Sequence, residues 1–560
     1  MQSPGEKQER SFCPNTYKPI RNLRKNHWLN WLFPVGGLLA LLWFLLRVIP
    51  KPSRATYPCQ RVAFPLASGF AIWLAGVIGS VTAFRKAKRC LAQSRYVLCA
   101  LLIVLSVGSV WFVQSITAEK AVYANEPTSN APIGVAKGIH PGRVVWIHDP
   151  DATDWAGPGD GHWWQSNHTD QAVVEQMMSR AIRALSGEKN DADAWNRLFE
   201  HFNETHGKEK SRYKKGEKIV VKVNYVGCMQ AWRGDTVTSI DDYNLRSADY
   251  MNTSPQMIIA LLRQLVNEAG VNEADITVGD TLCYFPNEFY KMCHNEFPNV
   301  RYLEYLGKFS RSGAKLSTVP FYWSTPEAKG KKQDFVPASY AEAEYLINLA
   351  NLKSHNDQAG ITLCAKNHYG SLVRRPARQS GYYDLHKDLP FNTPGMGHYR
   401  PLVDLMGHKH LGGKTLLYLI DGLYAGQHAK ERAPSKWNSP PFNGDWTSSL
   451  FASQDPVAID AVGYDFLWNE WDDGSHRSGT NDYLIEAALA DKPPSGTFYD
   501  PDHEGNVTRL GSLGVYEHWN NSTDKRYSRN LGTGNGIELV KLTSATKTLS
   551  AFWFPATANN

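Results

Sequence analysis

The residues best suited to chemistry in this sequence are lysine, histidine and asparagine side chains that follow a long apolar run. The run leads to Lys353 and His355, and Lys366, Asn367 and His368 come shortly afterwards. Ammonium groups can bind an anion, and an imidazole can act as general acid or base near neutral pH. The pattern predicts proton transfer on an anionic group. Solvated lysines and structural histidines would give the same spacing.

Other polar residues also follow apolar runs. Lys222 and Asn224 end one such run, and Asp280 and Asp421 end two others. Carboxylates and imidazoles together suit a divalent metal, so we expect a metal site built from His355, His368 and Asp280. Asp455 precedes a proline, which indicates first of all a helix cap.

Several familiar sites are missing from the sequence. There is no G-x-S-x-G elbow, no H-E-x-x-H helix and no C-x-x-C pair, so neither an iron–sulfur cluster nor a c-type haem is expected. Residues 412–415 read Gly-Gly-Lys-Thr, but the first glycine of a phosphate loop is replaced by His408. Cys283 and Cys293 could form a disulfide or remain buried thiols.

A segment rich in histidine, aspartate and tryptophan spans residues 148–170. It follows an apolar run, and loops at strand ends hold ligands in α/β folds. Its carboxylates and imidazoles could hold a metal while its indoles stack on a flat substrate. A solvated loop with Asx turns and buried indoles explains the same composition.

Strand-like and helix-like stretches alternate along residues 143–545. Apolar, β-branched runs predict strands at 144–147, 218–226, 276–278, 345–349 and 415–420, and helical spacing predicts helices at 169–185, 255–269 and 457–468. This alternation is typical of an α/β fold with a mainly parallel sheet. Because the region is long, we expect it to be two-lobed.

The charge of the chain divides near residue 115. The formal net charge of +6 is the sum of +13 over residues 1–115 and −7 over residues 116–560. Uncharged runs of 19, 23 and 23 residues at 28–46, 62–84 and 96–118 are long enough to cross a bilayer. The cations flanking these runs predict a cytoplasmic N-terminus and an extracytoplasmic C-terminal domain. The lipid bilayer, rather than nucleic acid, is then the partner of these cations.

These observations predict five parts of the chain. A cytoplasmic tail (1–27) and a three-helix transmembrane anchor (28–118) come first, followed by a linker (119–142), the α/β domain (143–545) and a tail (546–560).

Six motifs in this order resemble the domain of unknown function 362 family. They are Val221-Lys222-Val223-Asn224, Thr253-Ser254-Pro255, Val278-Gly279-Asp280, Lys353-x-His355 with Lys366-Asn367 and Gly370, Ile420-Asp421-Gly422, and Ser453 to Ala461, which contains Asp-Pro-Val-Ala-Ile-Asp. A weaker similarity is to the nickel-dependent lactate racemases, in which a histidine, a glycine-bearing loop and a lysine occupy an interdomain cleft. That similarity implies His355 as acid or base and Lys366 beside an anionic cofactor or substrate.

The motifs and the resemblance together give a set of expected roles. The catalytic candidates are His355, Lys366, Lys353 and Asp421, and the candidates for binding a small-molecule substrate are Lys222, Asn224, Asn367, Asp280 and Asp455. We expect acid/base or metal-assisted chemistry on a small anionic or carbohydrate-like substrate. A non-catalytic ligand- or metal-binding module and an anchored subunit of a membrane redox complex are the alternatives.

Overall fold

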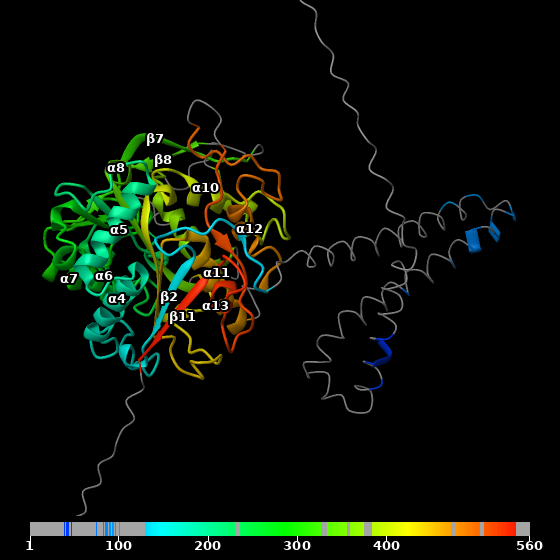
Figure 1. The fold of residues 1–560 in the computed structure, drawn as a ribbon, viewed down its shortest axis with the longest axis horizontal. Coiled ribbons are helices and arrows are strands. Elements are labelled where there is room, and N and C mark those ends of the chain that lie inside the picture. The colour runs from blue at the N-terminus through cyan, green and yellow to red at the C-terminus, as the bar shows by residue number, and fades with distance from the viewer. Residues whose placement is uncertain are drawn as a thin grey trace, which may run out of the picture. The chain divides into compact units, whose positions relative to one another are not determined.

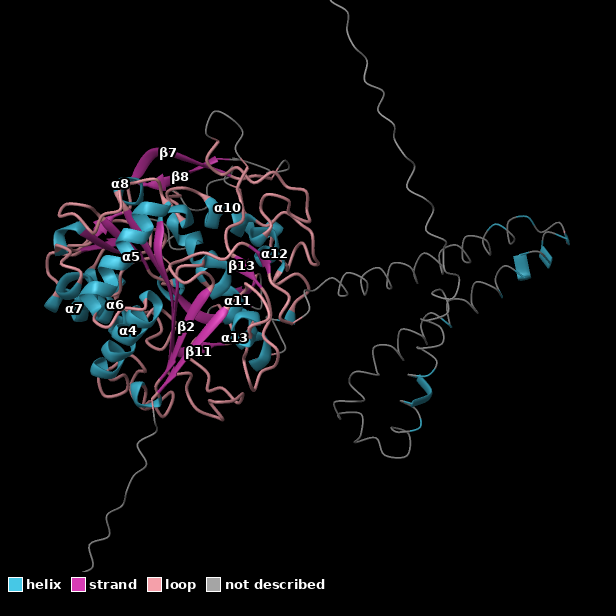
Figure 2. Ribbon diagram, viewed as in Figure 1, coloured by secondary structure: helices cyan, strands magenta, loops and turns pink. Residues whose placement is uncertain are grey.

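A ten-stranded sheet runs through the middle of the domain, with helices on both of its faces (Figures 1 and 2). The computed structural model describes residues 129–544 except 230–235, 326–332, 356–358, 375–382, 430, 472–475 and 504–508, together with scattered positions between 39 and 100. Residues Glu126–Asn560 form one compact unit.

The sheet is mainly parallel. In spatial order its strands are β14 (Glu538–Thr543), β2 (Arg143–His148), β12 (Ser449–Ser453), β11 (Thr415–Gly426), β9 (Tyr345–His355), β3 (Ile219–Lys222), β4 (Ile276–Gly279), β5 (Arg301–Glu304) and β6 (Ser312–Gly313), with β10 (Gly360–Thr362) paired to β9. Only β12 and the short β10 run against the others among these strands.

Alternation of side chains along the strands produces two separate apolar cores. In β2, Val145 and Ile147 face one core, whereas Val144 and Trp146 face the other. A strand buried on both faces reads as an unbroken apolar run, which explains why the sequence shows no polar alternation there.

The helices divide between the two faces. One core is covered by α4 (Gln171–Ser186), α5 (Asp191–Thr205), α6 (Pro255–Arg263) and α7 (Asn287–Glu296). The other contains α9 (Cys364–Asn367), α10 (Pro401–Gly407), α11 (Pro456–Glu470) and α12 (Asp482–Ala488). The remaining elements are shorter: α8 (Ala338–Glu342), α13 (Ser528–Leu531), the β7–β8 pair (Leu316–Tyr322 and Gln333–Pro337) and the β1–β13 pair (Ile133–Gly134 and Val515–Tyr516).

The chain leaves β3 and β9 toward opposite faces of the sheet. The connection from β3 to β4 includes α6 on one face, and the connection from β9 to β11 includes α9 and α10 on the other. Neighbouring parallel strands whose connections diverge in this way leave a crevice at their carboxyl ends, where α/β proteins bind ligands. The fold therefore points to the ends of β3 and β9.

The predicted α/β sheet is confirmed, but two expectations about the architecture are wrong. The domain is one unit, because its two cores lie on opposite faces of a single sheet instead of in two lobes. The three-helix transmembrane anchor is not supported either. No helix in the described part of the chain is long and apolar enough to cross a bilayer.

The predicted integral-membrane localisation, with its cytoplasmic N-terminus and extracytoplasmic domain, depended on that anchor and is likewise not supported. The anchor was predicted from the length of the uncharged runs alone. The predicted spans fall almost entirely outside the described residues, as do the predicted tails at 1–27 and 546–560. Within the expected linker, β1 pairs with β13.

Gly279 ends β4 where a side chain would strike β5. A Cβ atom built at Gly279 would lie 1.9 Å from the carbonyl oxygen of Leu303. We therefore expect Gly279→Ala to lower the free energy of unfolding of the full chain by about 3 kcal/mol, since a buried backbone carbonyl cannot move aside. Urea unfolding measures this. Gly511→Ala is the control, because nothing lies within 4 Å of the added Cβ. Equal midpoints for the two variants would contradict the prediction.

Candidate functional site

A small cavity lies where β3, β4 and β9 end. Its volume is about 40 Å³. Five of the expected catalytic and substrate-binding residues line it, namely Asn224, Asp280, His355, Lys366 and Asn367. The other lining residues are Val226, Met229, Leu282, Cys283, Thr362, Tyr369 and Gly370. Residues from four separate segments thus meet at the crevice that the strand order creates.

Lys222 forms the base of this site. Its side chain is fully buried, and its ammonium group donates to Asp280 Oδ2 at 2.6 Å and to Asn367 Oδ1 at 3.0 Å. It also donates to the carbonyl oxygen of Val223. A buried ammonium is stable only when it is paired and fully hydrogen-bonded, and these contacts meet that requirement. They also tie the ends of β3 and β4 to α9.

Asn367 holds α9 against the sheet. Its amide nitrogen donates to Asn348 Oδ1 at 2.8 Å, and Asn224 donates to Asn367 Oδ1 at 3.3 Å. Asn348, in the middle of β9, donates in turn to the carbonyl oxygen of Cys364 at 2.9 Å. The three amides therefore set the position of the turn that carries Lys366.

Asp460 of α11 supports the same turn from the other side. Its carboxylate accepts hydrogen bonds from the backbone N–H groups of Cys364 at 2.8 Å and Ala365 at 3.0 Å, which are the first amides of α9. Tyr483 also donates to it. Burial raises the pKa of Asp460 to about 6. This contact explains the second aspartate of the Asp-Pro-Val-Ala-Ile-Asp motif.

Gly370 has a specific steric role. A Cβ atom at this position would lie 2.4 Å from Asp280 Oδ2, the oxygen that accepts from Lys222. The Gly370 carbonyl also accepts from both the backbone N–H and the hydroxyl of Thr281. Only glycine lets the loop after α9 approach the Lys222–Asp280 pair this closely.

His355 and Lys366 are the residues of the cavity that can transfer a proton or bind an anion. His355 ends β9, opposite Gly360 of β10, and is 9% exposed. Lys366 is 8% exposed, and its ammonium group lies 4.3 Å from the centre of the Tyr369 ring. An imidazole and a cation thus line one small cavity.

Two predicted catalytic residues do not line this cavity. Lys353 is fully buried and donates to the carbonyl oxygen of Met251 at 2.9 Å, and burial lowers its pKa to about 7. Asp421 accepts from the backbone N–H groups of Ser254 at 2.8 Å and Leu423 at 3.1 Å, and burial raises its pKa. Asp421 thus holds the start of α6.

Thr253, from the same motif as Ser254, joins α6 to the strands beside the site. Its hydroxyl oxygen accepts from the backbone N–H of Asn224 at 2.8 Å, and the hydroxyl donates to Asn351 Oδ1 at 3.0 Å. This threonine therefore fixes the backbone of Asn224, which lines the cavity.

Asp455, predicted to bind substrate, lies at the opposite edge of the sheet. It follows β12, which runs antiparallel, so its end points away from the ends of β3 and β9. Its carboxylate accepts from four backbone N–H groups, those of Val457, Ala458, Lys137 and Val515. Burial raises its pKa to about 6. The helix cap that the following proline indicated is therefore confirmed.

The three predicted metal ligands are not brought together. His355 and Asp280 line the cavity, but the Asp280 carboxylate is engaged by Lys222 and by the backbone N–H of Leu282. His368 is fully buried and faces Ser371. Among the described residues, no three histidine, cysteine, aspartate or glutamate side chains are grouped to hold a metal ion.

Segment 148–170 is held by structural contacts of its own. His162 pairs with Asp249 at 3.0 Å, and the indoles of Trp163 and Trp164 donate to the carbonyl oxygens of Asp249 and Ala248. Asp170 caps α4. These contacts agree with the second expectation for this segment, a loop with Asx turns and buried indoles, and not with a ligand site. Cys283 and Cys293 are both buried free thiols.

Sequence reasoning did not assign roles to several residues of the site. They are Asn348, Asp460, Tyr369, Thr362 and Cys283. Asn348 offered a signal, because an amide within the apolar run of β9 must find a buried partner.

The Lys222–Asp280 pair generates a prediction about stability. Asp280→Asn leaves the buried ammonium without a counter-ion, so we expect the free energy of unfolding to fall by about 3 kcal/mol. Adding Lys222→Met removes that ammonium. The double variant should therefore regain part of the lost free energy of unfolding. Chemical denaturation of the wild type, both single variants and the double variant measures the coupling. Additive effects would contradict the pairing.

His368 generates a prediction about pH. Burial, with the nearby charge of Lys222, lowers the pKa of His368 from 6.5 to about 3. Between these values the unfolded chain binds a proton that the folded chain does not, so stability falls as pH decreases. The slope is about 1.4 kcal/mol per pH unit. We expect His368→Gln to lose this slope between pH 6 and 4, and His503→Gln, at an exposed imidazole, to keep it. Unfolding midpoints at several pH values test this, and parallel curves for wild type and His368→Gln would contradict it.

Comparisons with known proteins identify one part of the chain. No curated protein and no solved structure matches the chain. The matched family model begins after β3, so Lys222 and Asn224 lie outside it, although the structure places both at the site. Residues 243–465, which supply Asp280, His355, Lys366 and Asn367, match the model described as Domain of unknown function (DUF362).

Proposed function

We propose that the cavity at the ends of β3, β4 and β9 is the active site of an enzyme that transfers a proton to or from a small organic anion. The observation that carries this proposal is the convergence of His355 and Lys366, both about nine-tenths buried, on one small cavity. A general base needs a reacting group within hydrogen-bond reach, and an adjacent cation stabilises the negative charge of the substrate.

Each residue of the cavity has a role in this proposal. Lys366, held beside Tyr369, binds the anionic group, and His355 exchanges the proton. Asn224 Oδ1 is buried and accepts no hydrogen bond within the described part of the chain, so it can accept one from the substrate. Asp280 keeps the Lys222 ammonium neutralised and is a positioning residue.

The size of the cavity restricts the substrate. A volume of about 40 Å³ holds a small head group, whereas sites for drug-sized ligands are several hundred Å³. The reacting carbon and its anionic group would therefore enter together. Inversion at a carbon next to a carboxylate, the reaction expected from the weaker resemblance in the sequence, is one such reaction.

Exchange of carbon-bound hydrogen tests the proposal before the full reaction is known. The full-length protein in D₂O is incubated with a panel of small α-hydroxy and α-amino acids, and loss of the α-proton signal is followed by NMR. We expect exchange with at least one compound. His355→Asn and Lys366→Met should slow it by about 100-fold or more, the usual contribution of a general acid or base.

Lys387→Met removes an exposed lysine and serves as the matched control, with exchange expected to stay at the wild-type rate. Circular dichroism checks that each variant folds. A different result would contradict the proposed enzyme. If no compound exchanges its proton, but the NMR lines of panel compounds broaden in a way that depends on Lys366, the protein is a non-catalytic binding module.

A further inference from the structure

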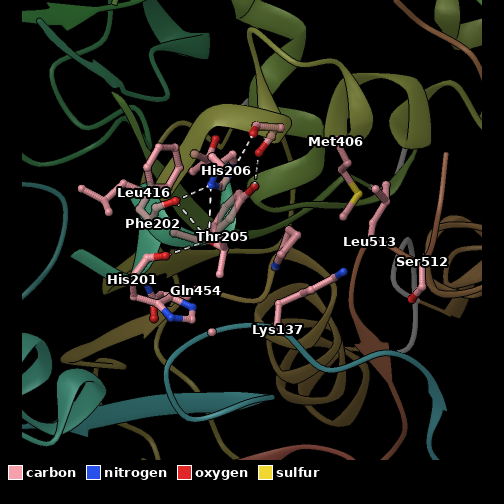
Figure 3. A pocket seen from close by; sticks show the side chains of 16 residues that line it. Lys137, His201, Phe202, Thr205, His206, Met406, Leu416, Gln454, Ser512 and Leu513 are labelled. Atoms are coloured by element: carbon pink, nitrogen blue, oxygen red, sulfur yellow. Dashed lines mark hydrogen bonds between the residues drawn. The ribbon is translucent and has the colours of Figure 1, made fainter. Parts of the chain in front are cut away.

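A second and larger cavity lies at the opposite edge of the sheet (Figure 3). Its volume is about 290 Å³. Thr415 and Leu416, at the start of β11, line it, as do Gln454 and Pro456, which follow the antiparallel β12. It is therefore separate from the cavity that contains His355 and Lys366.

The lining of this cavity contains basic groups and no acidic ones. Lys137, His201 and His206 contribute the basic side chains, and no aspartate or glutamate is among the lining residues. Residues 116–560 carry a net charge of −7, so a cavity without a carboxylate is a local exception. This composition favours an anionic ligand over a cationic one.

Lys137 is the residue placed to meet such a ligand. Its backbone is fixed, because its N–H donates to Asp455 Oδ2 at 2.8 Å and its carbonyl accepts from Gly142 at 2.9 Å. Its ammonium group has no hydrogen-bond or ion-pair partner in the described part of the chain. The side chain extends toward Met406 and Leu513 (Figure 3). Lys137 is exposed and is the lysine of the lining, whereas burial lowers the pKa of His201.

Other features of this edge cannot supply the anion contact. The Lys414 ammonium donates to the carbonyl oxygens of Tyr340 at 2.8 Å and Ala343 at 2.6 Å, so the Gly-Gly-Lys turn is not a phosphate loop. The first amides of α11 are capped by Asp455. Both ring nitrogens of His206 contact carbonyl oxygens, those of Phe202 at 2.7 Å and Gly413 at 2.9 Å. The anion contact in this cavity therefore depends on Lys137.

Much of the remaining lining is apolar. Phe202, Met406, Leu416, Pro456 and Leu513 contribute to it. Small-molecule sites combine an apolar wall with a few polar groups that fix orientation, and this cavity is near the lower end of their usual size.

We propose that this cavity binds a small organic anion that carries an apolar group, with its carboxylate or phosphate at Lys137 and its apolar part against Met406, Leu416 and Leu513. This site is independent of the proposed active site, since the two cavities share no lining residue.

Phenyl phosphate is a suitable probe, because it joins a dianion to an apolar ring. Isothermal titration calorimetry of the full-length protein should show saturable binding with a dissociation constant below about 1 mM. Benzyl alcohol, which has the ring without the charge, should bind at least about 10-fold more weakly. We expect Lys137→Met to weaken phenyl phosphate binding at least about 10-fold, the effect of losing the principal charge contact.

Three further variants locate the binding. Thr205→Trp, at the exposed end of α5, should weaken it by filling the cavity, and Lys189→Met, the same charge change on the exposed surface elsewhere, should leave it unchanged. Lys366→Met should also leave it unchanged. Absence of saturable binding, equal affinities of wild type and Lys137→Met, or a loss with Lys366→Met instead would overturn the proposal. The last result would move the anion to the other cavity.

Discussion

The buried ammonium group of Lys222 is the constraint on which the candidate site depends. Removing an ammonium ion from water costs several kcal/mol even after the protein relaxes, so the fold must place acceptors around it. Asp280 supplies the counter-charge and Asn367 an amide oxygen, and these residues come from the end of β4 and from α9. One ion therefore sets the spacing of three segments that line the cavity. Gly370 leaves the room that this arrangement requires.

Local signals in the sequence were sufficient for several of the elements beside the site. The apolar runs at 345–349 and 415–420 are the cores of β9 and β11, and Ser254-Pro255 and Asp455-Pro456 mark the starts of α6 and α11. Because the carboxyl ends of parallel strands share an edge, the motifs that follow β3, β4 and β9 could be expected to meet. The structure brings them to one cavity.

Properties that depend on distant pairing could not be predicted in this way. The five residues of β12 carry no local sign of their direction, which is set by pairing with β2 about 300 residues earlier in the chain. The cap role of Asp455 was predictable from the proline that follows it, but its position at the other edge of the sheet, away from the site, was not. The burial of Lys353 and His368 likewise depends on the segments that pack over them. Burial cannot be predicted from the residue type, because lysine and histidine side chains are often exposed.

The position of β2 also has a consequence for the order in which the chain can fold during synthesis. β2 is among the first strands of the domain to be made, yet its two neighbours in the sheet are β12 and β14. The side chains of Arg143 and Glu538, which pair at 2.8 Å, are 395 residues apart in sequence. Until the ribosome has added the last of these strands, Val144, Val145, Trp146 and Ile147 have no permanent edge partner. A strand of this kind is prone to pair with other chains, so the nascent protein passes through a long period in which protection by a chaperone would be beneficial.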